Sequence, residues 1–242
     1  MSRRAAGLDA AAGGHASACP LCGCPGVRIF ATVNDRHYLR CRTCALVHLE
    51  ASHRLPVEAE RRVYEMHRNH PGDRGYRDFL DRLALPLAER LAPGACGLDY
   101  GCGPGPTLWV MLRERGFPME IYDPLFAPEN APLARTYDFV TCTETVEHFF
   151  HPGRELETLD GLLRPGGWLA IMTSFMPDEK EQFASWHYVR DPTHVSFYSR
   201  ATMQWIAASF GWAFDCPCPT VALFNKPSRV HGAAVITGAQ DP

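Results

Sequence analysis

The chain has 242 residues, of which 46% are hydrophobic and 21% are charged, and its formal net charge is −3. This is the composition of a soluble globular protein, and the length allows one well-buried α/β domain plus a small module. The slightly acidic charge disfavours an extended nucleic-acid surface, and no apolar run is long enough to cross a bilayer.

The N-terminal part of the chain predicts a tail followed by a metal-binding module. Residues 1–18 are rich in Ala and Gly and lack the apolar core of a signal peptide, which predicts a disordered tail. Residues 19–50 contain two Cys-x-x-Cys pairs, made of Cys19, Cys22, Cys41 and Cys44. Each pair can turn two thiolates toward one ion, and two pairs complete a tetrahedral zinc site. A closed four-sulfur site has no position for substrate, so we expect a structural Zn²⁺.

Other uses of these cysteines are disfavoured by their spacing. Cys24, His37 and His48 could replace a ligand, but none has the matched spacing. A thioredoxin-like redox role is disfavoured because neither pair opens a helix after a strand. The ten cysteines therefore indicate metal ligation plus free thiols in a reducing compartment, and we expect a cytoplasmic protein.

Helical patterns follow the cysteine pairs. Residues 51–72 are charged and His-rich and predict a connector with one short helix at 57–67. From Asp73 onward the apolar residues recur at helical spacing, with Pro86 as an expected kink and Pro93-Gly94 as the end. The stripe consists of Phe79, Leu80, Leu83, Leu87 and Leu91.

The remaining chain alternates strands and helices. The predicted strands are 97–100, 119–123, 138–142 and 168–172, with a closing antiparallel pair at 212–216 and 220–225. The predicted helices cover 108–116, 156–163 and 203–210, and a turn at 165–167 stops the second of them. This alternation predicts an α/β fold with a doubly wound, mostly parallel sheet over residues 73–227. Residues 228–242 are expected to form a loose tail.

A glycine-rich turn lies between the first of these strands and its helix. Gly101, Gly103 and Gly105 alternate there, which permits a tight turn and close approach of a ligand to the backbone. Asp99 ends the strand before the turn, and Asp123 ends the next strand, where a carboxylate can bind ribose hydroxyls. Position 106 is Pro, so the G-x-G-x-x-G pattern of nicotinamide binding is not met.

Three segments in order resemble class I, Rossmann-like S-adenosylmethionine methyltransferases. They are 98–105 (LDYGCGPG), 137–148 (YDFVTCTETVEH) and 163–168 (LRPGGW). The resemblance implies S-adenosylmethionine as cofactor, with the three glycines along its methionine part. It also implies that Asp99 helps to hold the amino group and Asp123 the ribose. The other residues that it places beside the cofactor are Tyr122, Thr141, Cys142 and Thr143.

The chain departs from this family between Asp123 and Asp138. Only 14 residues separate them, and three are prolines. We therefore expect the usual helix to be missing and the third strand to be shortened or lost. Candidate adenine contacts are Tyr122, Pro124, Leu125 and Phe126.

Two clusters are candidates for acceptor chemistry. One contains Glu144, Glu147 and His148, and the other lies at 186–194 with His187 and His194. Histidine can accept a proton near neutral pH, so His148, His187 and His194 are the predicted catalytic residues, although each could instead brace a loop.

The leading prediction for function is methyl transfer to a small molecule such as a sugar or secondary metabolite. A similar zinc module accompanies this fold in some sugar C-methyltransferases. Two alternatives are a ribosomal RNA methyltransferase, which the acidic charge disfavours, and a non-catalytic zinc-dependent binding protein, which the intact glycine loop disfavours.

Overall fold

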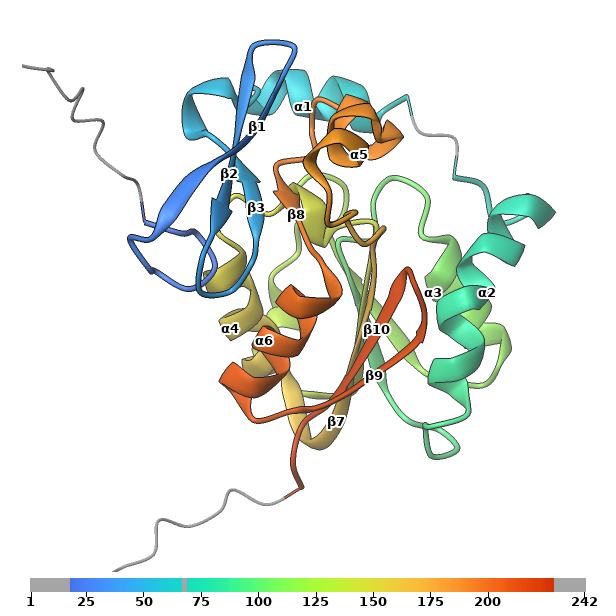
Figure 1. The fold of residues 1–242 in the computed structure, drawn as a ribbon. Coiled ribbons are helices and arrows are strands. Elements are labelled where there is room, and N and C mark those ends of the chain that lie inside the picture. The colour runs from blue at the N-terminus through green and yellow to red at the C-terminus, as the bar shows by residue number, and fades with distance from the viewer. Residues whose placement is uncertain (1–17, 67–68, 229–242) are drawn as a thin grey trace, which may run out of the picture.

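The computed structural model describes residues 18–66 and 69–228. They form a six-stranded sheet, in the order β5-β4-β6-β7-β10-β9, and a four-stranded sheet, in the order β1-β2-β3-β8 (Figure 1). Apart from residues 18 and 228, the expected tails lie outside the described residues.

The large sheet confirms the predicted strand–helix alternation. Its strands are β4 (Gly97–Tyr100), β5 (Met119–Tyr122), β6 (Tyr137–Thr143), β7 (Leu163–Met172), β9 (Ala213–Cys218) and β10 (Val221–Asn225). Strands β5, β4, β6 and β7 pair in parallel, whereas β10 pairs antiparallel with both β7 and β9. The doubly wound, mostly parallel fold class and the closing antiparallel pair are therefore confirmed.

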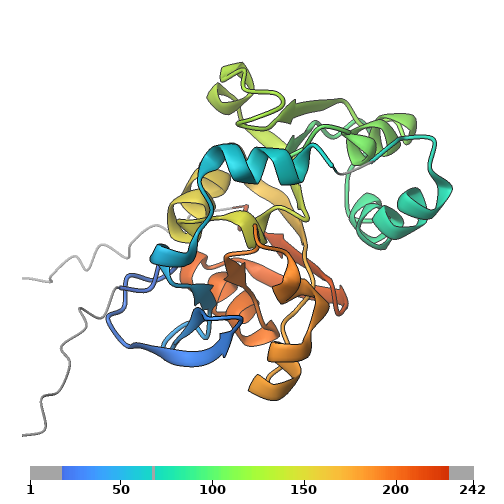
Figure 2. The same ribbon diagram turned by 90° about the horizontal axis from the view of Figure 1, so that it is seen from above.

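Helices cover both faces of this sheet (Figures 1 and 2). On one face, α2 (Arg74–Ala88) and α3 (Thr107–Glu114) pack through Leu83 and Met111 against Phe139 of β6. On the other face, α4 (Pro152–Leu162) and α6 (Arg200–Phe210) share a core with Val140 and Cys142. Successive side chains of β6 thus enter opposite layers, as the strand period of two requires.

The expected shortening around the third strand is confirmed. Strand β5 is the edge of the large sheet, and the chain between β5 and β6 forms only the 3-10 turn η2 (Ala131–Ala134) and a bridge from Asp123 to Ala127. This loop is fully within the described residues, and it carries the chain from the carboxyl end of β5 back to the start of β6, because both strands run parallel to β4.

Two local expectations differ from the structure. Residues 165–167 lie within β7 and not in a separate turn, because Leu163 already pairs with Tyr137 before an irregularity in the register. Gly166 has a φ of +83° and accommodates that irregularity. Helix α2 also continues through Pro86 and ends two residues later, before the expected Pro93-Gly94 stop.

The cysteine-containing segment packs directly on the large domain. Its strands β1 (Val27–Val33), β2 (Arg36–Cys41) and β3 (Val47–Leu49) are extended by β8 (Ser196–Phe197) from the C-terminal half. Cys19, Cys44 and Leu46 belong to the same buried cluster as the helices α4 and α6. The two sheets are therefore joined both by backbone pairing and by a shared core.

The remaining elements connect these layers. They are η1 (Ala51–His53), α1 (Val57–Tyr64), η3 (Val146–His148), α5 (Lys180–Ser185) and η4 (His187–Arg190). Within the part of the chain that the structure describes, no helix is long and apolar enough to cross a membrane.

Candidate active site

A cavity of about 700 Å³ lies at the carboxyl ends of β4, β5 and β6. Parallel strands expose their ligand-binding loops at this edge, and the volume is typical of small-molecule sites. The cavity is lined by the loops after these three strands, by α1 and by the segment around His194. It is therefore the place where the predicted cofactor and acceptor residues can meet.

The glycine turn after β4 forms one wall of the cavity. Gly101 has a φ of +77°, and a Cβ there would lie 2.2 Å from Cγ2 of Thr145, so only glycine fits. Gly103 has a φ of +63°, but a Cβ there would meet no atom within 4 Å. Gly103 thus faces open space in the cavity, where a ligand can approach the backbone.

The structure brings five of the nine predicted cofactor residues to the cavity wall. They are Gly101, Gly103, Tyr122, Asp123 and Thr143.

The other four predicted cofactor residues do not line the cavity. Asp99 is buried beneath the glycine turn, and Thr141 donates a hydrogen bond to its Oδ1 at 2.7 Å. Cys142 points into the core shared with α4, on the opposite layer from Thr141. A Cβ at Gly105 would lie 1.9 Å from the carbonyl oxygen of Asn69. Gly105 is therefore required for the close packing of these two backbone segments. Asp99, Thr141 and Cys142 are thus kept from the cavity by their burial within the sheet and by the face of the strand on which they lie. The sequence motif alone does not show either property.

Asp123 organises the loop around itself. Its Oδ2 accepts from the Gly103 N–H at 3.0 Å, and its Oδ1 accepts from Leu125 and Phe126 at 2.8 and 3.0 Å. An ionised carboxylate has about four acceptor positions, so roughly one remains for a ligand hydroxyl. Pairing with both ribose hydroxyls would therefore require Asp123 to share oxygens with the backbone.

Burial of Asp99 has an electrostatic consequence. Desolvation raises the pKa of Asp99 to about 6, the Thr141 hydroxyl opposes the rise, and the charge of Asp123 adds to it. Tyr76, Cys102 and Cys142 are further titratable groups that interact with Asp99. A carboxyl whose pKa is higher in the folded state loses stability as the pH rises from its unfolded to its folded pKa, and the full cost is present above the folded pKa.

We expect Asp99→Asn to stabilise the ligand-free protein in a pH-dependent way. Between the ordinary pKa of Asp and about pH 6, the folded wild type retains a proton that the unfolded chain releases, so its stability falls as pH rises. At about 1.4 kcal/mol for each pKa unit, the variant should gain about 2–3 kcal/mol at pH 7 and almost nothing at pH 4. Urea unfolding at both pH values measures this, and equal changes at both would contradict it.

The acceptor side of the cavity is formed by histidine and carboxylate side chains. His148, on η3, places Nδ1 3.1 Å from the carbonyl oxygen of Thr193. Its ring lies 4.9 Å from the ring of His194 and 5.1 Å from that of Tyr64, both at steep angles. The structure thus brings together His148 and His194, two of the three predicted catalytic histidines.

The third predicted catalytic histidine, His187, lies elsewhere. Its side chain is exposed on η4 and does not line the cavity. The 3-10 turn instead directs the next residue, Tyr188, inward, where it is buried. The structure therefore gives no support to a catalytic role for His187.

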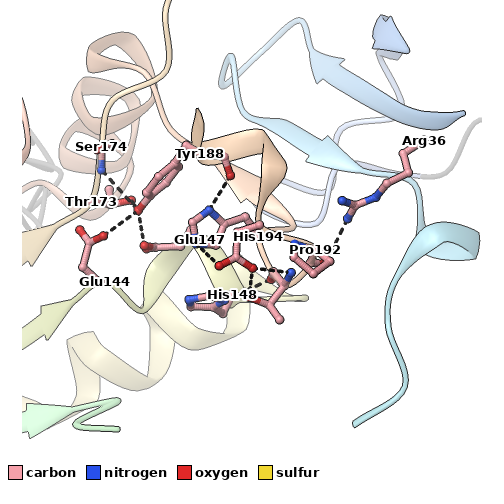
Figure 3. A network of polar contacts seen from close by, with 11 residues as sticks. Arg36, Glu144, Glu147, His148, Thr173, Ser174, Tyr188, Pro192 and His194 are labelled. Carbon is pink, nitrogen blue, oxygen red and sulfur yellow. Dashed lines mark hydrogen bonds and ion pairs between the residues drawn. The ribbon is translucent and has the colours of Figure 1, made fainter. Parts of the chain in front are cut away.

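Tyr188 lies at the centre of a buried polar network (Figure 3). Its hydroxyl forms a short hydrogen bond to Oε1 of Glu147 and lies 3.3 Å from Oε2 of Glu144 and 3.0 Å from Oγ1 of Thr173. Burial raises the pKa values of Glu144 and Glu147 to about 7. The cavity therefore adjoins two carboxyl groups able to hold or release protons near neutral pH.

The sequence did not identify every side chain at this site. Glu60 and Tyr64 of α1 line the cavity, and Tyr76 enters from the start of α2. A short helix near these positions was predicted, but no pattern indicated that it would cover the loops after β5 and β6. Burial raises the pKa of Glu60 to about 7, which adds a further titratable group.

The four predicted metal ligands are brought together in the structure. One Sγ from each of Cys19, Cys22, Cys41 and Cys44 lies within 4.8 Å of the others. The Cys19–Cys44 and Cys22–Cys41 sulfur pairs are each 3.5 Å apart. Cys24, His37 and His48 do not join this cluster.

Comparisons with known proteins agree on the family. A family model described as a methyltransferase domain matches residues 66–216. A malonyl-[acyl-carrier protein] O-methyltransferase from Porphyromonas gingivalis is 28% identical over 105 residues, which are 42% of this chain and 38% of that protein. The match thus spans well under half the length of that relative.

Solved methyltransferase structures are similar in fold to this chain. A 1,6-didemethyltoxoflavin-N1-methyltransferase from Burkholderia thailandensis, with bound 1,6-didemethyltoxoflavin and S-adenosylhomocysteine, has a TM-score of 0.50 and 15% identity. The likeness covers 83% of this chain and 99% of that one. An O-methyltransferase family protein from the same organism has a TM-score of 0.44 and 19% identity, covering 63% and 58% of the two chains. With a family model that matches more than half of its residues, the chain belongs to the methyltransferase-domain family.

Proposed function

We propose that this protein transfers a methyl group from S-adenosylmethionine to a small-molecule acceptor, and that a structural zinc ion holds its cysteine module together. The observation that carries the proposal is one cavity that joins the glycine turn and Asp123 to the polar cluster of His148 and His194. Cofactor-type and acceptor-type side chains thus face the same space.

The cavity fits the cofactor at its glycine wall. The open space beside Gly103 allows a ligand to approach the turn, and Asp123 retains an acceptor position for a hydroxyl. Tyr122 and Phe126 add aromatic surface for a base. We assign the methionine part to the glycine turn and the ribose to Asp123, and we leave Asp99 as a buried support beneath the turn.

S-adenosylmethionine supplies an electrophilic methyl group, and its S–C bond breaks as the acceptor forms a bond to that carbon. An acceptor hydroxyl or amine must also lose a proton in the reaction. Glu144, Glu147 and the two histidines are the groups within reach of that half of the cavity. The enzyme's task is therefore to align the nucleophile with the methyl group and to handle one proton.

The charge of the cavity indicates the class of acceptor. The described residues that line it include no Lys or Arg but six carboxyl groups: Glu60, Asp123, Glu144, Glu147, Glu155 and Asp191. An anionic acceptor would meet no countercharge from them, whereas an amine or a hydroxyl-rich molecule would find hydrogen-bond acceptors. We therefore propose a neutral or cationic acceptor, in contrast to the malonyl group named for the Porphyromonas gingivalis relative.

The cysteine cluster fits a zinc ion. A tetrahedron with Zn–S bonds of about 2.3 Å has sulfur–sulfur edges of about 3.8 Å, close to the 3.5 Å of the two sulfur pairs. Cys19, Cys41 and Cys44 are almost fully buried, as ligands of a closed structural site are. Its expected role is to hold the loops of residues 19–26 and 41–46 against the large domain.

Cofactor binding tests the proposal. Calorimetry should show that S-adenosylmethionine and S-adenosylhomocysteine bind and that NADH does not. Asp123→Ala should weaken binding by about 1.5–3 kcal/mol, because a charged acceptor is lost. Glu129→Ala, a surface carboxylate on the same loop, is the matched control and should leave affinity unchanged. Unchanged affinity in Asp123→Ala would place the ribose elsewhere, and no binding by the wild type would overturn the function.

A further inference from the structure

We infer that Glu147, His148 and His194 form a binding site for a divalent metal ion in the acceptor half of the cavity. One ring nitrogen from each histidine and one carboxylate oxygen of Glu147 lie within 4.8 Å of one another. Two histidines and one carboxylate, with positions left open for other ligands, suit ions such as Mn²⁺, Fe²⁺ and Zn²⁺. This inference rests on the proposed function, because it says how that half of the cavity handles an acceptor.

Each of the two histidine rings is held by a backbone carbonyl at Nδ1. Nδ1 of His148 faces the Thr193 carbonyl at 3.1 Å, and Nδ1 of His194 faces the Tyr188 carbonyl at 2.8 Å. A carbonyl can only accept, so Nδ1 of each ring carries a proton, and Nε2, when unprotonated, is the nitrogen that would bind a metal. A second nitrogen that donates to a backbone carbonyl is the usual support of a metal-ligating histidine.

Glu147 is the least explained polar side chain of the site. It is 0% exposed, and only Oε1 is hydrogen bonded, by Tyr188. Its Oε2 is buried without a hydrogen-bond partner among the described residues. A buried carboxylate oxygen without a partner costs free energy, and a bound cation beside the two rings would remove that cost.

The surroundings favour a cation. The described lining of the cavity contains six carboxyl groups and no Lys or Arg, and Asp191 places Oδ2 3.8 Å from Nε2 of His194. Figure 3 shows Glu147, His148 and His194 together, with Tyr188 joined to Glu147 by a hydrogen bond. The ion would coordinate an oxygen or nitrogen of the acceptor. The two histidines would then be metal ligands and would not act as bases.

Binding of Mn²⁺ to the zinc-loaded full-length protein tests the inference. Mn²⁺ is a hard ion that the four thiolates disfavour, so its binding excludes the cysteine cluster. His37, Glu50 and His53 form another group that could hold such an ion, so variants of the Glu147 site must show which group binds it. Loss of the free-ion electron paramagnetic resonance signal should show one Mn²⁺ per chain. Glu147→Gln and His194→Ala should each weaken it by about 10–100-fold or more, since even an outer-shell partner is worth that much.

Two matched variants keep the test specific. Glu144→Gln removes the neighbouring carboxylate that lies outside the cluster, and His187→Ala removes an exposed histidine of the same segment, so both should bind Mn²⁺ like the wild type. Retained S-adenosylhomocysteine affinity shows that each variant is folded. If the wild type binds S-adenosylhomocysteine but no Mn²⁺, or if Glu147→Gln binds Mn²⁺ normally, the metal site is overturned while the proposed function stands. Absence of S-adenosylhomocysteine binding would overturn the function instead.

Discussion

Cys44→Ser is expected to release the zinc ion and unfold residues 19–50. Cys44 is 1% exposed, and its sulfur lies 3.5 Å from that of Cys19. Structural Zn²⁺ contributes about 10–16 kcal/mol to the folding of a small module, which three ligands and short strands cannot replace. Metal analysis should show about one Zn²⁺ per chain in the wild type and none in the variant.

The effect should extend to the acceptor side of the cavity. The N–H of Leu49 donates to the carbonyl of Val195 at 2.8 Å, and Arg36 donates to that of Pro192 at 3.1 Å (Figure 3). Val195 in turn donates to the carbonyl of Glu147. The module thus supports the segment that carries His194, so Cys44→Ser should lower turnover more than it weakens cofactor binding.

A matched cysteine variant separates zinc loss from general damage. Cys24 lies in the same segment but outside the four-sulfur cluster, and its thiol accepts from Thr43 and Gly26. Cys24→Ser should therefore keep the zinc and the protection of residues 19–50 in hydrogen exchange. Wild-type protein purified without metal, yet with these residues still protected, would contradict the zinc assignment.

The fold could be predicted because its signals are local. Short apolar runs at 97–100, 138–142 and 168–172 are bounded by glycines and by helical stripes, so each strand is recognisable within its own window. The three prolines after Asp123 likewise indicate the loss of a helix without knowledge of the rest of the chain. Residues 165–167 differ from the prediction because they bulge between the two β6 partners Leu163 and Trp168, and Gly166 and Gly167 bond to Lys226 after β10.

The site was predicted less completely because tertiary contacts decide how deeply a residue is buried and which way its side chain points. Thr141 and Thr143 lie on the same side of β6, yet only Thr143 extends beyond the sheet to the cavity. His187 and Tyr188 are neighbours in an irregular turn, and no period indicates which of them points inward. Helix α1 reaches the site only because the chain before it is anchored by β3, which pairs with distant β8.

Of the predicted catalytic residues, His148 should have the largest effect on turnover. It lines the cavity beside Glu147 and His194, and its ring is held by the Thr193 carbonyl and by Tyr64. Removing a side chain that takes part in deprotonating the acceptor, as a base or as a ligand of an ion that binds the acceptor, costs about 10²–10⁴ in rate. His148→Ala should therefore lower the turnover number by this factor with the true acceptor.

Cofactor affinity distinguishes this effect from a disturbed fold. His148 follows β6, whereas the cofactor wall is built from the loops after β4 and β5, so S-adenosylhomocysteine should bind His148→Ala about as tightly as the wild type. His187→Ala is the matched control, since that exposed side chain lies outside the cavity, and it should retain full turnover. Full turnover by His148→Ala would make the histidine a structural brace. Loss of S-adenosylhomocysteine binding would instead show that η3 supports the cofactor wall, and the catalytic role would then have to be sought in Glu147 and His194.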